Sequence, residues 1–181
     1  MICVQLADGF EEVEAVTVVD LLRRANIDVI TVSIMNRLEI TGAHDIKIMA
    51  DKLFENIDFD DCEMIILPGG GGGATKLDNH EGIIEKLKHF NKNGKWIAAI
   101  CAAPMILGHH GIFSGQQATI YEGMEDELKG AVYVDKKVVV DGHIITSQGP
   151  ATAINFALTI IKIIKGVKVA TEIADDLLQY K

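Results

Sequence analysis

One cysteine stands where its thiol could act as a nucleophile. Cys101 comes directly after the apolar run 95–100 and directly before the short helical pattern 102–111. At a strand-to-helix turn, a thiol lies near unpaired amide N–H groups and the positive end of a helix dipole, and both stabilise a thiolate. This position predicts a thiol pKa below the free value of about 8.5. The alternative is an inert core residue, because cysteine is among the residue types most often buried.

The other two cysteines lack such a setting. Cys3 lies inside the apolar run 2–6 and is predicted to be a core residue. Cys62 is flanked by carboxylates, whose charge disfavours a thiolate, at Asp60, Asp61 and Glu63. An odd count of three cysteines in 181 residues predicts a reducing compartment and no disulfide framework.

A carboxylate is the first candidate partner for the Cys101 thiol. In EEVE (11–14), Glu11 and Glu12 suit the first turn of a helix, where acids complement the dipole. Glu14 differs, because it shares a helical stripe with the apolar positions 18, 21 and 25. A partly buried carboxyl has a raised pKa and can donate a proton or act as a base. The pattern leaves this role and a simple dipole role both open.

The glycine run PGGGGGA (68–74) is the second candidate partner. It is a flexible turn, a phosphate cradle or a backbone oxyanion site. A nucleotide P-loop is disfavoured because no Gly-Lys-Ser/Thr follows the run. Glycines would let amide N–H groups approach a reacting carbonyl closely. The six histidines show no metal-ligand spacing, so the sequence predicts neither a metal site nor a cofactor.

Short apolar runs alternate with helical patterns along the chain. Strands are expected at 2–6, 28–34, 45–50, 64–68 and 95–100, helices at 11–25, 80–94, 102–111, 149–166 and 167–178, and a hairpin at 136–147. This alternation predicts an α/β fold: a doubly wound, mostly parallel sheet in a three-layer α/β/α sandwich, with the hairpin as an antiparallel decoration. The chain is expected to form one domain, 1–181. The carboxyl ends of strands 2–6, 64–68 and 95–100 are expected to converge.

Charge and hydropathy restrict the partners. The net charge of −9 argues against nucleic acid and against an anionic membrane surface, both of which need clustered Lys and Arg. No stretch approaches the roughly 20 apolar residues of a membrane span. The first residues, MICVQLADGFEEVE, have no basic region and too short an apolar run for a secretory signal. A cytoplasmic protein is expected.

Together these segments resemble a known family. LADGFEEVEAV, ILPGGGGGA, AAICAAP and ITSQGPATAINFAL occur in the order and spacing of the DJ-one (DJ-1)/ThiJ/PfpI superfamily, and most resemble the branch of the Parkinson-disease-associated DJ-1 protein and its bacterial relatives. The resemblance covers nearly the whole chain. It implies a flavodoxin-like fold and a homodimer. It also implies that Cys101 is the family's reactive cysteine on a strained turn, with the protonated Glu14 carboxyl bonded to its sulfur.

The resemblance assigns further residues to the site. The backbone N–H groups of Gly70 and Ala102 would form the oxyanion site, and Gly69 belongs to the same pocket. Two more sets are implied: Gly149 and Pro150 beside the pocket, and Arg24 and His44 near its dimer-facing side.

Two positions depart from the family pattern. Protease-like members carry histidine directly after the cysteine, where this chain has Ala102, so peptidase activity is not expected. Tyr121 stands where the closest branch often has a pocket histidine, and a phenol with a pKa of roughly 10 is a poor base at neutral pH.

The resemblance implies a stress-protective protein that needs no cofactor. One activity is glyoxalase or deglycase chemistry on a small reactive carbonyl substrate or a glycated protein, through Cys101 and Glu14. The alternative is a redox sensor or chaperone-like protein in which Cys101 oxidises to a sulfinate. A binding module that keeps the fold with altered chemistry is a third option, supported by Tyr121.

Overall fold

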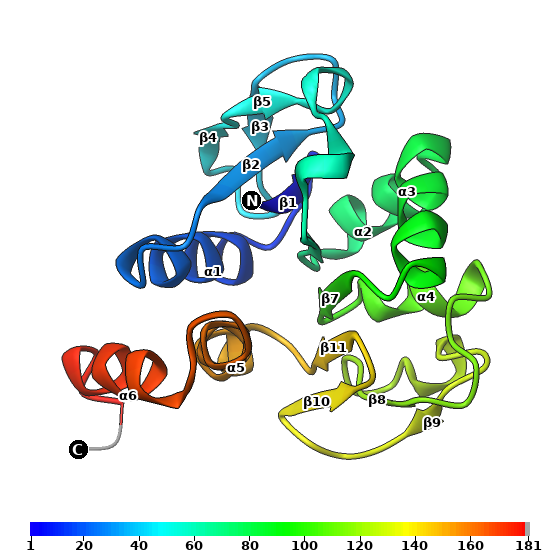
Figure 1. Ribbon diagram of the computed structural model, residues 1–181. Helices are drawn as coiled ribbons and strands as arrows, with labels where there is room; N and C mark the ends of the chain where they lie inside the picture. Colours follow the sequence, from blue (N-terminus) through cyan, green and yellow to red (C-terminus); the bar gives the residue numbers. More distant parts are fainter. Residues whose placement is uncertain (180–181) are drawn as a thin grey trace.

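The computed structural model describes residues 1–179, and a central sheet organises them (Figure 1). The sheet has seven strands in the order β10 (Val138–Asp141), β11 (Ile144–Ser147), β7 (Trp96–Ile100), β6 (Met64–Leu67), β1 (Ile2–Leu6), β2 (Val29–Ser33) and β5 (Lys52–Leu53). Every neighbouring pair is parallel except β10 with β11. The doubly wound, mostly parallel sheet is therefore confirmed.

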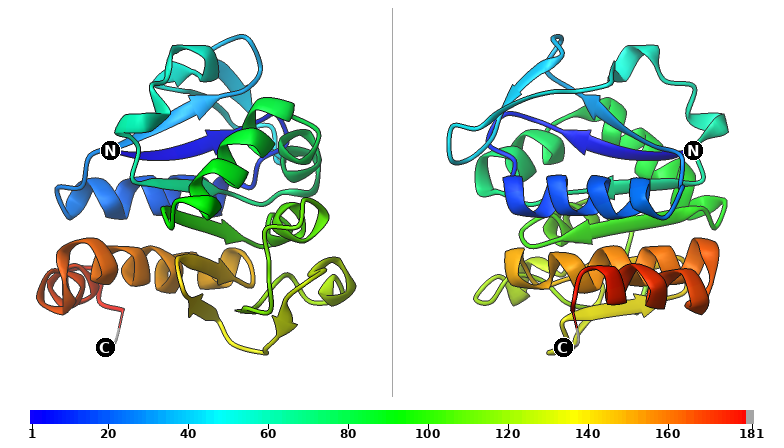
Figure 2. Two further views of the ribbon diagram at one scale, coloured as in Figure 1. Left: turned by 45° about the vertical axis from the view of Figure 1, so that its right-hand side comes forward. Right: turned by 90° about the vertical axis from the view of Figure 1, so that its left-hand side faces the viewer.

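Helices cover both faces of this sheet, as Figures 1 and 2 show. One layer consists of α1 (Glu12–Arg24), α5 (Ala153–Lys165) and α6 (Val167–Asp176). The opposite layer consists of α2 (Gly71–Asp78), α3 (Glu81–Lys92) and α4 (Pro104–His109). Each layer packs its apolar side chains into a separate core cluster against the sheet. The three-layer sandwich is confirmed.

The apolar strands explain why the sheet is covered twice. Alternate side chains of a strand point to opposite faces. In β1, Val4 and Leu6 enter the core under α1 and α5, while Cys3 enters the core under α2, α3 and α4. Every residue of β1 and β6 is buried. Strands buried on both faces have this continuous apolar character, which the sequence displays.

The hairpin expected at 136–147 is confirmed as β10 and β11. Strand β11 joins the main sheet in parallel with β7, and only β10 runs antiparallel at the edge. Two other elements differ from the sequence expectation. The segment 45–50 contributes β4 (Lys47–Met49), which pairs with β3 (Glu39–Thr41) in a hairpin outside the main sheet. The glycine run, for which a flexible turn was one of three interpretations, begins α2 at Gly71.

Short elements complete the chain. A two-stranded parallel pair joins β8 (Gln117–Ala118) to β9 (Val132–Tyr133). The 3₁₀ turns are η1 (Phe54–Asn56), η2 (Phe59–Asp61), η3 (Glu125–Glu127) and η4 (Pro150–Thr152). Pro150 thus opens a 3₁₀ turn before α5 and does not lie in the helix itself. Within residues 1–179, no helix has the length and apolar character that crossing a membrane requires.

Cys3 and Cys62 are joined in a disulfide, with their Cα atoms 6.6 Å apart. The expectation of three separate thiols was therefore wrong, although both side chains are buried as core residues. The contact follows from strand pairing. Ile2 lies opposite Met64 in the β1–β6 pair, so the chain enters β6 beside the start of β1. A separation of 59 residues hides this proximity in the sequence.

Candidate active site around Cys101

Cys101 occupies a sharp backbone turn between β7 and α4. Its φ angle is +63°, in the left-handed region that a residue with a side chain rarely adopts. This conformation costs roughly 1–2 kcal/mol and persists only where the surroundings enforce it. Two hydrogen bonds do so: the Cys101 N–H donates to the Ser147 carbonyl at 3.0 Å, and the Tyr121 N–H donates to the Cys101 carbonyl at 3.0 Å. The side chain is half-buried.

The three expected strand ends meet at this turn. Strands β7, β6 and β1 are consecutive neighbours in the sheet, so the segments after them lie side by side. Glu14 comes from the first turn of α1 after β1, and Gly69 and Gly70 follow β6. The predicted convergence of Cys101, Glu14 and the glycine run is confirmed.

Glu14 is completely buried, together with the stripe of Val18, Leu21 and Ala25. Its Oε2 accepts a hydrogen bond from the Gly69 N–H at 2.7 Å. Its other oxygen, Oε1, accepts no hydrogen bond from any group in residues 1–179. The buried interpretation of Glu14 is therefore correct, and a side-chain hydrogen bond between Glu14 and Cys101 influences the pKa values of both groups.

Glycine is required where the carboxyl and the thiol meet. A Cβ atom added at Gly69 would lie 2.5 Å from the Cys101 Cβ, 2.7 Å from Glu14 Oε2 and 3.0 Å from the Cys101 Sγ. Gly70 has a φ of +85°, and its added Cβ would lie 2.5 Å from the Glu11 backbone nitrogen. Because Gly69 and Gly70 have no side chains, Glu14 and Cys101 can approach each other closely.

The Cys101 thiol is harder to ionise than its position predicted. Burial, and then the neighbouring Glu14 carboxylate, raise the pKa of Cys101 to about 12. The N–H groups of Gly70 and Ala102 act in the opposite direction and lower this pKa, as expected at a helix start, but their effect is smaller. The predicted net lowering of the thiol pKa is therefore wrong.

Burial also raises the pKa of Glu14, to about 7, against the opposing hydrogen bond from Gly69. Glu14 therefore exchanges a proton near neutral pH. The two groups interact directly, so they titrate as a pair. A thiolate at Cys101 is favoured when the carboxyl of Glu14 holds the proton, because the like-charge repulsion is then absent.

Tyr121, Gly149 and Pro150 line one cavity. The Tyr121 side chain is 49% exposed. Its ring covers Gly149, where an added Cβ would lie 3.3 Å from the ring atom Cδ2. The structure thus brings three residues of the expected pocket together: Tyr121, Gly149 and Pro150.

Arg24 does not join this site within one chain. It lies at the last residue of α1, whereas Glu14 lies in the first turn, and ten residues of helix separate them by about 15 Å. Its Nε pairs with Asp20 Oδ2 at 2.8 Å on the surface. Exposed pairs of this kind contribute little stability.

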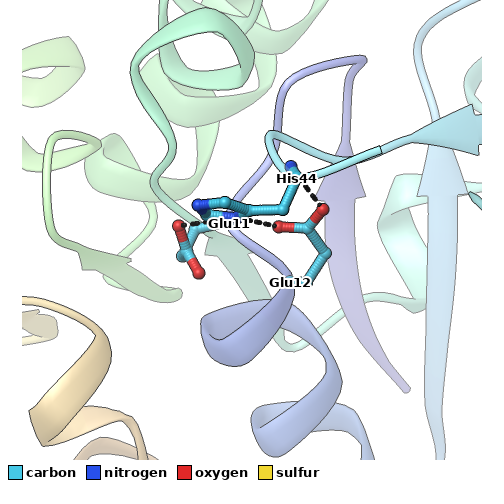
Figure 3. Close-up of side chains that lie close together, drawn as sticks. All are labelled: Glu11, Glu12 and His44. Atoms are coloured by element: carbon cyan, nitrogen blue, oxygen red, sulfur yellow. Dashed lines mark hydrogen bonds and ion pairs between the residues drawn. The ribbon is translucent and has the colours of Figure 1, made fainter. Parts of the chain in front are cut away.

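His44 borders the site through two glutamates, as Figure 3 shows. Its backbone N–H donates to Glu12 Oε1 at 2.7 Å, and its Nδ1 lies 2.9 Å from Glu12 Oε2 and 3.9 Å from Glu11 Oε2. These bonds raise the pKa of His44, and Glu12 contributes most to the increase. Glu11 lies next to the reactive centre, because its N–H donates to the Gly69 carbonyl at 3.0 Å.

Sequence reasoning missed this role of Glu12, which it assigned to the helix dipole alone. The buried Glu12 carboxylate ties the loop between β3 and β4 to the start of α1. The side chains of Glu11, Glu12 and His44 offer ligand atoms within 4.8 Å of one another. The ion pair and hydrogen bonds account for this arrangement, and no short-range sequence signal indicated it.

The fold and site define a flavodoxin-like protein with a cysteine on a strained strand–helix turn beside a buried glutamate. The model of the DJ-1/PfpI family matches residues 1–163. The protein dj-1beta of Drosophila melanogaster is 38% identical over 175 residues, covering 96% of this chain and 94% of that protein. The Parkinson disease protein 7 homolog of Danio rerio is 35% identical over 172 residues, covering 93% and 91%. The chain belongs to the DJ-1/PfpI family.

Solved structures of DJ-1 proteins have the same fold as this chain. The crystal structure of Drosophila melanogaster DJ-1beta has a TM-score of 0.94 at 38% identity and covers 98% of this chain and 96% of its own. A structure of Toxoplasma gondii DJ-1, described as oxidized, has a TM-score of 0.94 at 34% identity, with 98% and 97% covered. In the DJ-1 homologs B and A of Arabidopsis thaliana, the match spans only 37% and 41% of the relative's length.

Proposed function

We propose that the protein converts reactive dicarbonyls, free or attached to proteins, into 2-hydroxy acid products without a cofactor. The observation that carries this proposal is the meeting of the Cys101 thiol with the buried Glu14 carboxyl, next to the N–H groups of Gly70 and Ala102. A nucleophile, a proton carrier and two hydrogen-bond donors are the groups that an internal redox rearrangement of a dicarbonyl needs.

The first step makes a carbon–sulfur bond. In the small population in which the proton of the pair has moved to Glu14, the Cys101 thiolate adds to the aldehyde carbon of methylglyoxal. The aldehyde oxygen becomes an alkoxide, which the N–H groups of Gly70 and Ala102 stabilise. Glu14 then protonates this oxygen, which yields a neutral hemithioacetal and a Glu14 carboxylate.

The second step moves hydrogen between adjacent carbons. The Glu14 carboxylate removes the proton from the carbon bonded to sulfur and delivers it to the ketone oxygen, which forms an enediol. Glu14 then takes the hydroxyl proton from the sulfur-bearing carbon, whose oxygen becomes a carbonyl, and gives this proton to the neighbouring carbon. The product is a thioester of lactate on Cys101. Water cleaves the thioester and restores the thiol, so methylglyoxal and water become lactate without net oxidation. A Glu14 pKa of about 7 suits this exchange, because general acid–base catalysis works best near the operating pH.

Lactate formation from methylglyoxal tests the proposal. We expect Cys101→Ser to lower the rate more than about 100-fold, because the hydroxyl is a weaker nucleophile. A Cys3→Ser/Cys62→Ser double variant serves as the matched control, since it removes the two other sulfur atoms and should retain turnover if folded. Equal rates in the wild type and Cys101→Ser would exclude Cys101 as the nucleophile.

A redox sensor is the second candidate, because Cys101 is the free cysteine while Cys3 and Cys62 are paired and buried. The N–H groups of Gly70 and Ala102 are positioned to bond sulfinate oxygens on Cys101. The oxidized state in the description of the Toxoplasma gondii structure is consistent with such chemistry in a relative. Mass spectrometry after graded peroxide should find oxidation at Cys101 first, and a reduced Cys101 at full oxidant dose would contradict this function.

The catalytic role of Cys101 requires a reduced thiol, so we also propose a reducing compartment, the cytoplasm. The Cys3–Cys62 linkage can persist there, because both sulfur-bearing residues are buried away from soluble reductants.

We propose a homodimer formed through α1 and the β3–β4 hairpin. Large apolar side chains are exposed there, with Val13 at 51%, Val16 at 49%, Ile46 at 55% and Met49 at 65%. Val16 and Met49 line the same surface pocket, and exposed apolar side chains gathered in this way mark an interaction site. Light scattering of the protein as it elutes from a size-exclusion column should give twice the chain mass. The Val16→Asp variant should give the mass of the monomer. Val140→Asp, at a comparably exposed valine on the edge strand β10, should leave the dimer intact.

A further inference from the structure

A groove away from the active site lies between α5, α6 and the start of β10. The two helices pack next to each other, as Figure 1 shows. The groove has a volume of about 380 Å³, which lies in the range of small-molecule sites. None of the residues that line it belongs to the site around Cys101. The groove is therefore independent of the proposed catalysis.

Small side chains on α6 leave this space open. Residues three and four apart share one face of a helix, and the α6 residues that line the groove have this spacing: Val167, Ala170, Thr171 and Ala174. The hydroxyl groups of Thr171 and Thr159 donate to carbonyls of their own helices, at 3.0 and 2.8 Å. Leu158 and Val138 complete the apolar lining. The middle of the groove therefore favours hydrocarbon over polar groups.

The groove has a lysine toward each end. The Lys137 carbonyl accepts a hydrogen bond from Ser147 Oγ, which also bonds Thr152 Oγ1 at 2.7 Å. These bonds hold Lys137 beside the turn that leads into α5, where Asn155 also lines the groove. Lys162 follows Asn155 by about two turns of α5, or about 10 Å along the helix axis. The two positive charges thus enclose an apolar stretch.

These charges are not neutralised within residues 1–179. The lysine side chains that pair with carboxylates there are those of Lys47 and Lys168. No Asp or Glu is among the described residues that line the groove. The side-chain amide of Asn155 also forms no hydrogen bond with another group in residues 1–179. In a chain with a net charge of −9, the groove is a local concentration of positive charge and of free hydrogen-bond donors.

We propose that this groove binds a dicarboxylate whose two charged ends are joined by an apolar chain. One carboxylate contacts Lys137 and the amide of Asn155, and the other contacts Lys162. The chain between them covers Leu158 and Ala170. A carboxylate only accepts hydrogen bonds, whereas ammonium groups and the amide nitrogen donate them, so the ligand and the groove are complementary.

Calorimetric titration of the full chain at low ionic strength tests this inference with suberate, succinate and octanoate. Suberate has two carboxylates on a long apolar chain. Succinate has the same charge on a chain too short to reach both lysines, and octanoate has a long chain with a single carboxylate. We expect suberate to bind about fivefold more tightly than either, because an exposed ion pair and a buried methylene each contribute a factor of this size. Salt near 1 M should reduce the preference over octanoate, because it screens exposed charges.

The Lys162→Gln variant should reduce the preference for suberate over octanoate to within about twofold, because one ion pair is lost. Lys165→Gln is the matched control, since Lys165 is exposed on the same helix but does not line the groove. It should retain the full preference. Both substitutions replace exposed side chains, and equal melting temperatures would confirm that the fold is kept.

Three results would overturn the inference. The first is the absence of suberate binding to the wild type. The second is equal affinity of suberate and either other probe, which would show that the second charge or the apolar chain makes no contact. The third is an unchanged preference for suberate in Lys162→Gln.

Discussion

The thiol of Cys101 and the carboxyl of Glu14 compete for protons inside one buried site. Their pKa values of about 12 and about 7 mean that neutral pH finds the carboxyl partly ionised and the thiol protonated. Reactivity therefore depends on the small population in which the proton has moved to Glu14. The helix start contributes through two N–H groups, but the proton on Glu14 decides whether the sulfur carries charge.

Replacing this carboxyl should make Cys101 easier to ionise. Glu14→Gln removes the negative charge that raises the thiol pKa, and the amide can donate a hydrogen bond to a thiolate. We expect the thiol pKa, measured by pH-dependent iodoacetamide alkylation, to fall by more than one unit, while lactate formation is lost with the proton carrier. An unchanged or higher thiol pKa in Glu14→Gln would contradict this account.

Glu14 should also make stability depend on pH. Its folded pKa of about 7 lies above its ordinary value of 4.5, so the folded state binds the proton more tightly. This stabilisation is present below about pH 4.5 and is lost as pH rises through about 7, by at most about 3 kcal/mol. Urea unfolding at pH 4.5 to 8 should show this loss in the wild type and a flatter profile in Glu14→Gln.

At the scale of elements, the glycine run has two parts with different structural roles, one at the active site and one at the start of α2. Gly69 and Gly70 provide space at the active site, whereas Gly71 begins α2 and has nothing within 4 Å of an added Cβ. We expect Gly69→Ala to push Cys101 and Glu14 apart and to lower Cys101 alkylation and turnover at least about tenfold, since sub-ångström displacement of catalytic groups is costly.

Gly71→Ala is the matched control and should leave both rates unchanged. It should also raise thermal stability slightly, because alanine is a better helix former than glycine. Equal alkylation of Cys101 in Gly69→Ala and Gly71→Ala would show that the close approach at Gly69 is unimportant.

The side chain of His109, the last residue of α4, connects α4 to α2 and η3. Its Nδ1 lies 2.9 Å from Asp78 Oδ2 at the end of α2, and its Nε2 lies 2.8 Å from Glu127 Oε2 in η3. His110 Nε2 also lies 3.0 Å from Asp78 Oδ1. Because both ring nitrogens of His109 face carboxylates, the protonated imidazole can donate to both, and this raises the pKa of His109.

This arrangement predicts a second loss of stability as pH rises. Its cause is the attraction between a charged imidazole and two carboxylates, whereas the cause at Glu14 is burial. Glu127 and Asp78 raise the pKa of His109 above 6.5, so its stabilisation is present below pH 6.5 and is lost as pH rises through the folded pKa. The melting temperature should therefore fall less between pH 6 and 9 in His109→Gln than in the wild type. His89→Gln, on the exposed face of α3 and without an ion pair among the described residues, should keep the wild-type slope.

At the scale of the whole molecule, the disulfide between Cys3 and Cys62 closes a loop across the centre of the sheet. A crosslink over 59 residues restricts the unfolded chain and contributes up to about 4 kcal/mol. We expect reduction under denaturing conditions, followed by refolding, to lower the melting temperature, and the Cys3→Ser/Cys62→Ser variant to match the reduced protein. Three alkylatable thiols in denatured, unreduced protein would contradict the linkage.

The sequence predicted the features that depend on local period and on parallel strand order. The apolar stripe through Val18 and Leu21 left a buried Glu14 as one of two open interpretations, and strand alternation predicted that its turn meets Cys101. The missed features depend on tertiary environment. The Cys3–Cys62 contact and the Glu12–His44 pair join distant segments, and the thiol pKa depends on desolvation that no spacing reveals.

The backbone at Cys101 implies a conflict between durability and activity. Glycine or asparagine adopts a φ of +63° at a lower conformational cost than cysteine does. Exchanging Cys101 for either residue would remove roughly 1 kcal/mol of backbone strain. A library randomised at this position and selected only for heat resistance should therefore drift away from cysteine. A library selected for carbonyl turnover should return to it, because natural selection for chemistry tolerates a less durable chain.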